Sequence, residues 1–124
     1  MKTLVTCFGL LFSAMSMMAQ TNPQPGYIIT NENDTIRGTI DYLNDFRNMH
    51  TCHFRADGAQ DFQKYKPGEI KGYRLTNNGI FYVTRTFAVG NTEQTIFAEY
   101  LLKGGVSLYY ARDAHTQYYY WVRS

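Results

Sequence analysis

Residues 70–87, IKGYRLTNNGIFYVTRTF, contain the pattern that decides the fold. The second half of this stretch, 80–87, is rich in β-branched and aromatic residues, which favour extended strands. Between it and the first half lies Asn77-Asn78-Gly79, and an Asn-Gly pair accepts the positive φ angles that a tight hairpin turn requires. The stretch therefore predicts two antiparallel strands, 70–76 and 80–87, joined by a hairpin.

A second hairpin is predicted upstream. Apolar residues and glycine alternate with polar residues over 35–42, and this period of two is typical of a half-buried strand. The preceding residues 31–34, NEND, have turn chemistry, because Asn and Asp tolerate left-handed backbone and close local hydrogen bonds. A short strand at 26–30 comes before this turn, so both segments together indicate a hairpin.

The rest of the chain continues as short strands joined by close turns. At 95–103 helix is the alternative, since Ala98, Leu101 and Leu102 favour helix, but Gly104-Gly105 followed by a β-rich segment favours a hairpin. We therefore expect an all-β fold, a small antiparallel meander that forms a partly open barrel or a sandwich. The remaining predicted strands are 50–55, 62–65, 95–103, 106–112 and 117–122. The predicted core residues are Ile36, Ile40, Tyr73, Phe81, Val83, Phe97, Leu101, Val106 and Leu108.

The N-terminus has the three parts of a secretory signal peptide. Lys2 supplies a positive charge, an uncharged run rich in Leu and Phe follows, and Ser16 and Ala19 are the small residues of a cleavage site. A membrane anchor is the alternative, but the run is shorter than a spanning helix of about 20 residues. We expect a signal peptide at 1–19, a loose arm at 20–25 and one β domain at 26–124, located in the periplasm, at the outer membrane or outside the cell.

Charge and hydropathy limit the partners. Removing Lys2 with the signal peptide leaves eleven Lys and Arg against ten Asp and Glu, so no field for nucleic acid follows from the balance. No second apolar stretch is long enough to cross a bilayer, and we expect no transmembrane segment in the mature chain. No phosphate loop or hydrolase motif occurs, so we expect neither a cofactor nor an enzyme.

One cluster of metal-competent residues occurs, at His50, Cys52 and His53. On a strand His50 and Cys52 would point to one face and His53 to the other, so the three cannot converge without a bulge. Cys52 is the only cysteine after the signal peptide, and an internal disulfide is therefore impossible. A buried Cys52 is the favoured interpretation, and a metal site is the weaker one.

Aromatic residues gather near the C-terminus. In strands, consecutive aromatic side chains point to both faces, so they cannot all enter a single core. Packing across neighbouring strands is the favoured explanation. Exposed Tyr and Trp are also suited to protein interfaces or to stacking on sugars. The candidate residues for an interface or a ligand are Tyr109, Tyr110, Tyr118, Tyr119, Tyr120 and Trp121.

Three segments carry a family resemblance: GYIIT at 26–30, DTIRGTI at 34–40 and YKPGEIKGY at 65–73, with 97–110 fitting downstream. Their order is similar to a β-rich family of exported Bacteroidota proteins of unknown function. In such proteins the domain sometimes stands ahead of a region that resembles an outer-membrane barrel. The resemblance implies a location in the cell envelope, and no catalytic residues carry over from it.

These observations predict a non-catalytic exported envelope module, whose role is protein–protein interaction or that of an accessory domain. The alternative is a small β domain that binds a glycan or another small molecule through its surface aromatic residues. The expected partner is an envelope protein or a glycan, and nucleic acid is not expected.

Overall fold

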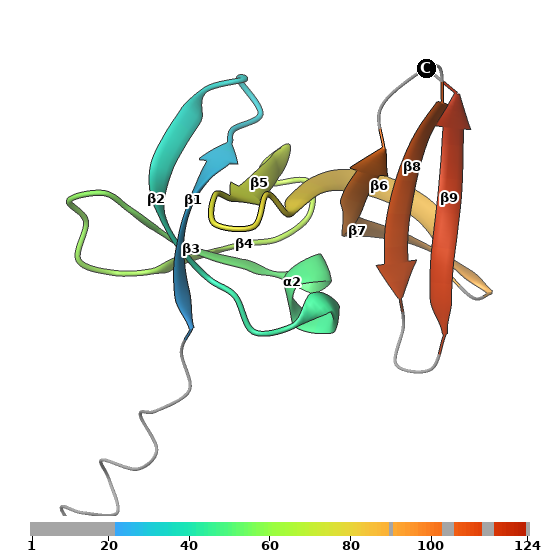
Figure 1. Cartoon of the computed structure of the whole chain (residues 1–124), viewed down its shortest axis with the longest axis horizontal. Helices are drawn as coiled ribbons and strands as arrows, with labels where there is room; N and C mark the ends of the chain where they lie inside the picture. The colour runs from blue at the N-terminus through green and yellow to red at the C-terminus, as the bar shows by residue number, and fades with distance from the viewer. Residues whose placement is uncertain (1–21, 90, 103–105, 113–115, 124) are drawn as a thin grey trace, which may run out of the picture.

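The computed structural model describes residues 22–89, 91–102, 106–112 and 116–123 (Figure 1). Apart from one short helix, the regular elements of the described chain are nine strands in one antiparallel sheet, in the order β4-β3-β2-β1-β5-β6-β7-β8-β9. The strands are β1 Pro23–Ile29, β2 Thr35–Asp41, β3 Cys52–Ala56, β4 Gln63–Tyr65, β5 Gly72–Leu75, β6 Phe81–Val89, β7 Thr92–Leu102, β8 Val106–Arg112 and β9 Gln117–Arg123. The helix is α2, Asp45–His50.

The topology is two meanders that share β1. This strand pairs with β2 on one side and with β5 on the other, so β2–β4 and β5–β9 extend in opposite directions from it. Figure 1 shows α2 between the two halves, where it contacts β7 and β8. The strands at the two ends, β4 and β9, pair on one side only, so the described sheet is open. The predicted all-β antiparallel fold is confirmed, as one continuous sheet.

The two hairpins predicted within 26–42 and 70–87 are present, and the turn predicted at Gly104-Gly105 lies outside the described residues. Gly79 has a φ angle of 76°, and its amide donates to the carbonyl of Leu75 at 2.9 Å, which closes the turn between β5 and β6. Between β1 and β2 the amide of Thr30 donates to the carbonyl of Asp34 at 2.8 Å, while Asn33 takes the left-handed conformation with φ 70°. The strand predicted at 95–103, rather than a helix, is also confirmed, since β7 spans Thr92–Leu102.

Several element boundaries differ from the prediction, and the starts of β1 and β3 are the two described here. Strand β1 begins at Pro23, so 23–25 pair with β2 instead of forming a loose arm. Asn22 explains this: its amide donates to Oδ1 of Asp41 at 2.7 Å, and its carbonyl accepts from the amide of Tyr42 at 3.0 Å. The second difference is His50, which ends α2 instead of beginning β3.

Helix α2 is positioned by side chains at its first turn and in its interior. Asn44 caps the N-terminus, its side chain accepting from the amide of Arg47 at 2.9 Å. Asn48 is buried, and its Oδ1 accepts from the amide of Leu43 at 3.0 Å while its carbonyl accepts from the hydroxyl of Tyr73. A helix of six residues is too short to be stable alone, so these tertiary contacts hold it.

The main core lies between α2 and the sheet. Ile28, Tyr73 and Tyr82 are opposite one another on neighbouring strands, so they share the face of the sheet that α2 covers, here called the helix face. All three side chains are buried, as are Met49 of α2 and Phe97 of β7. These large side chains fill the space between α2 and the sheet, and they bury the apolar surface of both layers away from water.

The core predictions are confirmed in part. Ile40, Tyr73 and Phe97 are buried. Ile36 and Leu101 are 39% and 43% exposed, so those two predictions are wrong. Ile36 lies beside the β1–β2 turn, where the burial pattern of β2 shows exposed residues, and Leu101 lies at an irregularity in the β7–β8 register. The other predicted core residues, Phe81, Val83 and Leu108, are half-buried; the side chain of Val106 lies outside the described residues.

Close approach of backbones explains two glycines in the sheet. Gly26 and Gly38 are directly opposite each other in the β1–β2 pair. A Cβ atom at Gly38 would lie 2.1 Å from the carbonyl oxygen of Arg55, and one at Gly26 would lie 2.3 Å from that of Arg74. Side chains are therefore excluded at both positions, because backbone oxygens cannot rotate away.

In the described part of the chain, no helix is long and apolar enough to cross a membrane. The predicted signal peptide, 1–19, lies outside the described residues.

Candidate functional site

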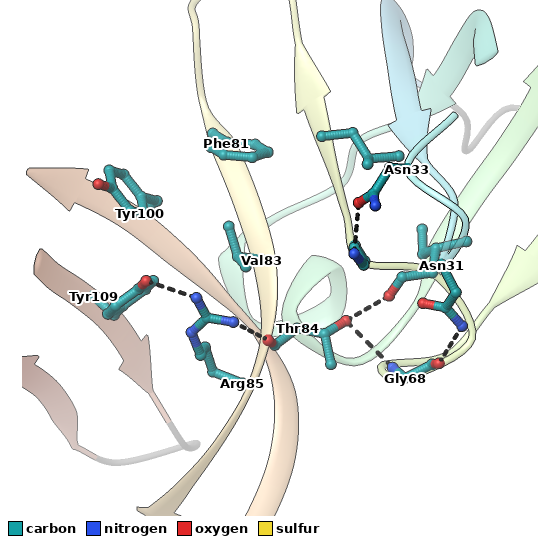
Figure 2. A pocket seen from close by; sticks show the side chains of 12 residues that line it. Asn31, Asn33, Gly68, Phe81, Val83, Thr84, Arg85, Tyr100 and Tyr109 are labelled. Atoms are coloured by element: carbon teal, nitrogen blue, oxygen red, sulfur yellow. Dashed lines mark hydrogen bonds between the residues drawn. The ribbon is translucent and has the colours of Figure 1, made fainter. Parts of the chain in front are cut away.

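A cavity of about 660 Å³ opens on the face of the sheet opposite α2 (Figure 2). Among its lining residues from β6, Phe81, Val83 and Arg85 lie at alternate positions, and Tyr82 between the first two points to the helix face. Tyr100 of β7 and Tyr109 of β8 extend the same face. The lining residues are Ile29, Asn31, Asn33, Gly68, Ile70, Lys71, Phe81, Val83, Thr84, Arg85, Tyr100 and Tyr109.

Aromatic rings form one wall of the cavity. The ring of Tyr100 packs edge-on against that of Tyr109, with centroids 5.2 Å apart and planes at 89°. Phe81 lies 6.0 Å from Tyr100 in a tilted arrangement. Edge-to-face contacts of this kind fix the orientation of the rings, so the apolar wall of the cavity is formed before a ligand binds.

Arg85 is held at the cavity by two hydrogen bonds. Its Nη1 donates to the backbone carbonyl of Thr84 at 3.0 Å, and its Nη2 donates to the hydroxyl of Tyr109 at 3.1 Å (Figure 2). The guanidinium also lies 5.2 Å from the centroid of the Tyr109 ring, a cation–π distance. A guanidinium has five N–H donors, so the two bonds orient the group and leave further donors available.

The opposite rim comes from the β1–β2 turn and the segment that precedes β5. Lys71 donates from Nζ to Oδ1 of Asn33 at 2.5 Å, and Asn31 donates from Nδ2 to the carbonyl of Gly68 at 3.0 Å (Figure 2). Thr84 of β6 ties the rim to the sheet, because its hydroxyl donates to the carbonyl of Ile70 at 2.7 Å and accepts from the amide of Gly68 at 3.2 Å. Segments distant in sequence thus form one connected rim.

The charged residues that line the cavity are both basic. Lys71 and Arg85 line it, and no Asp or Glu is among its described lining residues. Neither cation lies within salt-bridge distance of a carboxylate of the described residues. Arg74 is opposite Phe81 in the β5–β6 pair and lies 4.8 Å from the centroid of its ring, which adds a third positive charge on this face.

The six predicted aromatic residues do not form one platform. Tyr109 and Tyr110 are both buried, and as neighbours in β8 they point to opposite faces, so only Tyr109 lines the cavity. Tyr120 stacks on Phe87 with centroids 4.0 Å apart, and Tyr118 lies 6.3 Å from Tyr120. These four side chains therefore serve mainly in packing across strands.

Tyr119 and Trp121 are the exception. They are 56% and 65% exposed, and they share one face of β9 because they are two residues apart. Tyr119 contacts Tyr110 across the β8–β9 pair, with ring centroids 5.4 Å apart. Of the candidate aromatic residues, these two have the most surface available to a partner.

The predicted metal candidates are not brought together. His50 is on α2, where its Nδ1 lies 2.8 Å from the carbonyl of Phe46. Cys52 is fully buried, as favoured from the sequence, and burial raises the pKa of its thiol well above the ordinary value. His53 lies beside Arg47 and Asp41, and burial together with the Arg47 charge lowers its pKa. The described residues include no group of three His, Cys, Asp or Glu side chains that could hold a metal ion.

No family model, curated protein or solved structure matches the chain. The cavity residues Arg85, Lys71, Asn31 and Asn33 were missed by sequence reasoning. One signal could have found Arg85. Phe81, Val83 and Arg85 are two residues apart in a predicted strand, so all three side chains share one face. The rim residues gave no such signal, because they come from turns whose relative position only the fold determines.

Proposed function

We propose that this chain is an exported, non-catalytic module of the cell envelope that binds a partner protein along strand β9. The observation that carries the proposal is that β9 is the last strand of the described sheet and carries two exposed aromatic residues. Strand β9 ends the described sheet and pairs only with β8, over Gln117–Arg123. Trp121 and Tyr119 lie on this strand with more than half of their surface exposed.

An edge strand of this kind is suited to strand addition. Its outward N–H and C=O groups can pair with an extended segment of another protein, while exposed side chains of the strand select that segment. Natural edges are commonly protected by proline, by lysine or by shortness. Strand β9 has seven residues, no proline and one charged residue, Arg123. The opposite edge, β4, has three residues only and offers less backbone to a partner.

The partner test compares Trp121→Ala and Tyr119→Ala with Phe62→Ala. Phe62 is an exposed aromatic residue 41% accessible to solvent, and it lies beside β4, away from β9. Because all three side chains are exposed, we expect each variant to change the free energy of unfolding by no more than about 0.5 kcal/mol. We expect the two β9 variants, and not Phe62→Ala, to lose a partner cross-linked to β9 in envelope extract, measured by quantitative mass spectrometry.

Undiminished cross-linking in both β9 variants would refute an interface at this edge. A loss of several kcal/mol on Trp121→Ala would show instead that the tryptophan is part of the core.

The export component rests on Lys2, the apolar run and the Ser16–Ala19 pattern. We expect the protein isolated from its host to begin at or near Gln20, because signal peptidase cuts after small residues at such a site. N-terminal mass spectrometry of envelope and cytoplasmic fractions measures this. Intact Met1 in the cytoplasmic fraction would contradict export.

A further inference from the structure

We propose that the cavity between the β1–β2 turn and strands β6–β8 binds a carboxylate-bearing sugar, a uronic acid residue of a glycan. This site is on the opposite face of the sheet from Tyr119 and Trp121, and the inference does not depend on the interface proposed at β9.

The charged residues of the site favour an anionic ligand. Lys71 and Arg85 line the cavity without a carboxylate partner among the described residues. The guanidinium of Arg74 lies next to the ring of Phe81, another lining residue. The bonds that Lys71 and Arg85 make go to neutral acceptors, an amide oxygen for the first and a carbonyl and a phenol for the second. Both cations are exposed and have no carboxylate partner among the described residues, so both are accessible to an anionic ligand.

The shape of Arg85 suits an oxyanion that offers two oxygens side by side, a property that carboxylate and phosphate share, and we assign a carboxylate with phosphate as the alternative that the test distinguishes. A guanidinium is planar and presents parallel N–H groups that match the two oxygens of a carboxylate. The bonds to Thr84 and Tyr109 hold this plane before a ligand arrives, so little side-chain freedom is lost on binding. Lys71, on the other rim, supplies a second point charge.

The remaining surface suits a sugar ring. Tyr100 and Phe81 are half-buried, so part of each ring faces the cavity, and aromatic faces stack on the apolar side of a pyranose. Asn31 and Asn33 contribute amide groups that can exchange hydrogen bonds with ring hydroxyls. A cavity near 660 Å³ is within the usual range of small-molecule sites and accommodates one or two sugar units.

The test titrates the protein with three related probes and follows amide chemical shifts by NMR. The probes are methyl β-glucuronide, methyl β-glucoside, which lacks the carboxylate, and glucose 6-phosphate, which replaces it. We expect the glucuronide to shift amides of β6 and of residues 68–71, with a Kd about tenfold or more below that of the glucoside, as for hydrogen bonds to a charged group.

Variants assign the effect to the cavity. Arg85→Gln should weaken glucuronide binding about tenfold or more, and Lys71→Gln about two- to fivefold, since Lys71 supplies a single point charge at an exposed position. Arg37→Gln is the matched control: it removes the same charge from an exposed arginine that packs over Tyr27, outside the cavity lining. It should leave the Kd within about twofold, because an exposed charge outside the site is screened by solvent.

Equal binding of glucuronide and glucoside would overturn the proposal, as would an equal effect of Arg85→Gln and Arg37→Gln. Tighter binding of glucose 6-phosphate would overturn the assignment to a carboxylate. Trp121→Ala should leave glucuronide binding unchanged, which separates this site from the proposed interface.

Discussion

Gly38→Ala is expected to lower the free energy of unfolding by about 3 kcal/mol or more, the upper end of the range for forcing extra atoms into a packed site. The added Cβ would lie 2.1 Å from the carbonyl oxygen of Arg55 and 2.8 Å from two ring atoms of Phe54. The first of these neighbours is backbone, so relief requires the β2–β3 pair to separate. Gly26 is opposite Gly38, and the movement would therefore spread into β1.

Urea unfolding followed by circular dichroism measures this loss. Gly58→Ala is the control, because the same atoms are added where nothing lies within 4 Å. Gly58 has a φ angle of 85°, so alanine there should cost about 1–2 kcal/mol through its left-handed backbone alone. If Gly38→Ala is no more destabilising than Gly58→Ala, the close approach of β2 and β3 is not a constraint on the fold.

Tyr73→Ala is expected to destabilise the protein by about 3–5 kcal/mol, as for other large buried aromatic residues. Its ring is fully buried, stacks on Tyr82 with centroids 4.9 Å apart and meets Phe97 edge-on at 5.1 Å. Its hydroxyl donates to the carbonyl of Asn48, which connects the sheet to α2. The substitution would leave a cavity where the two layers meet.

Two further variants separate the parts of this effect. Tyr73→Phe keeps the ring and leaves the Asn48 carbonyl without its donor, so we expect a loss of about 1–3 kcal/mol. Tyr119→Ala removes the same atoms from an exposed position of the sheet and should cost no more than about 0.5 kcal/mol. Equal losses for Tyr73→Ala and Tyr119→Ala in urea unfolding would contradict the placement of the core.

Local patterns in the sequence were sufficient for the strands. Alternation over 35–42 and the Asn78-Gly79 turn both depend on neighbouring residues, and the structure has strands and a hairpin at these places. The predicted strand at 95–103 succeeded for the same reason, since turn residues on its C-terminal side outweighed its helix-forming residues. Helix α2 was missed because buried Asn48 and its tertiary partners, not propensity, stabilise it.

The face that each strand buries was harder to predict. Period-two alternation separates the faces of a strand without saying which one is covered. On β6 the predicted core residues Phe81 and Val83 line the cavity, whereas Tyr82 between them is buried on the helix face. This difference arises because α2 covers one side of the sheet, and the position of α2 cannot be derived from β6.

The sequence alone determined the all-β class, the succession of nine strands along the chain and the turns at 31–34 and 77–79, because these depend on residues near one another in the chain. It also placed Tyr119 and Trp121 among the aromatic candidates. Only the tertiary structure decided which aromatic residues are exposed, and only it brought Lys71 and Arg85 to one cavity. Both outcomes depend on strand register and on the path of the β1–β2 turn over the sheet, which are set by long-range packing and not by local propensity.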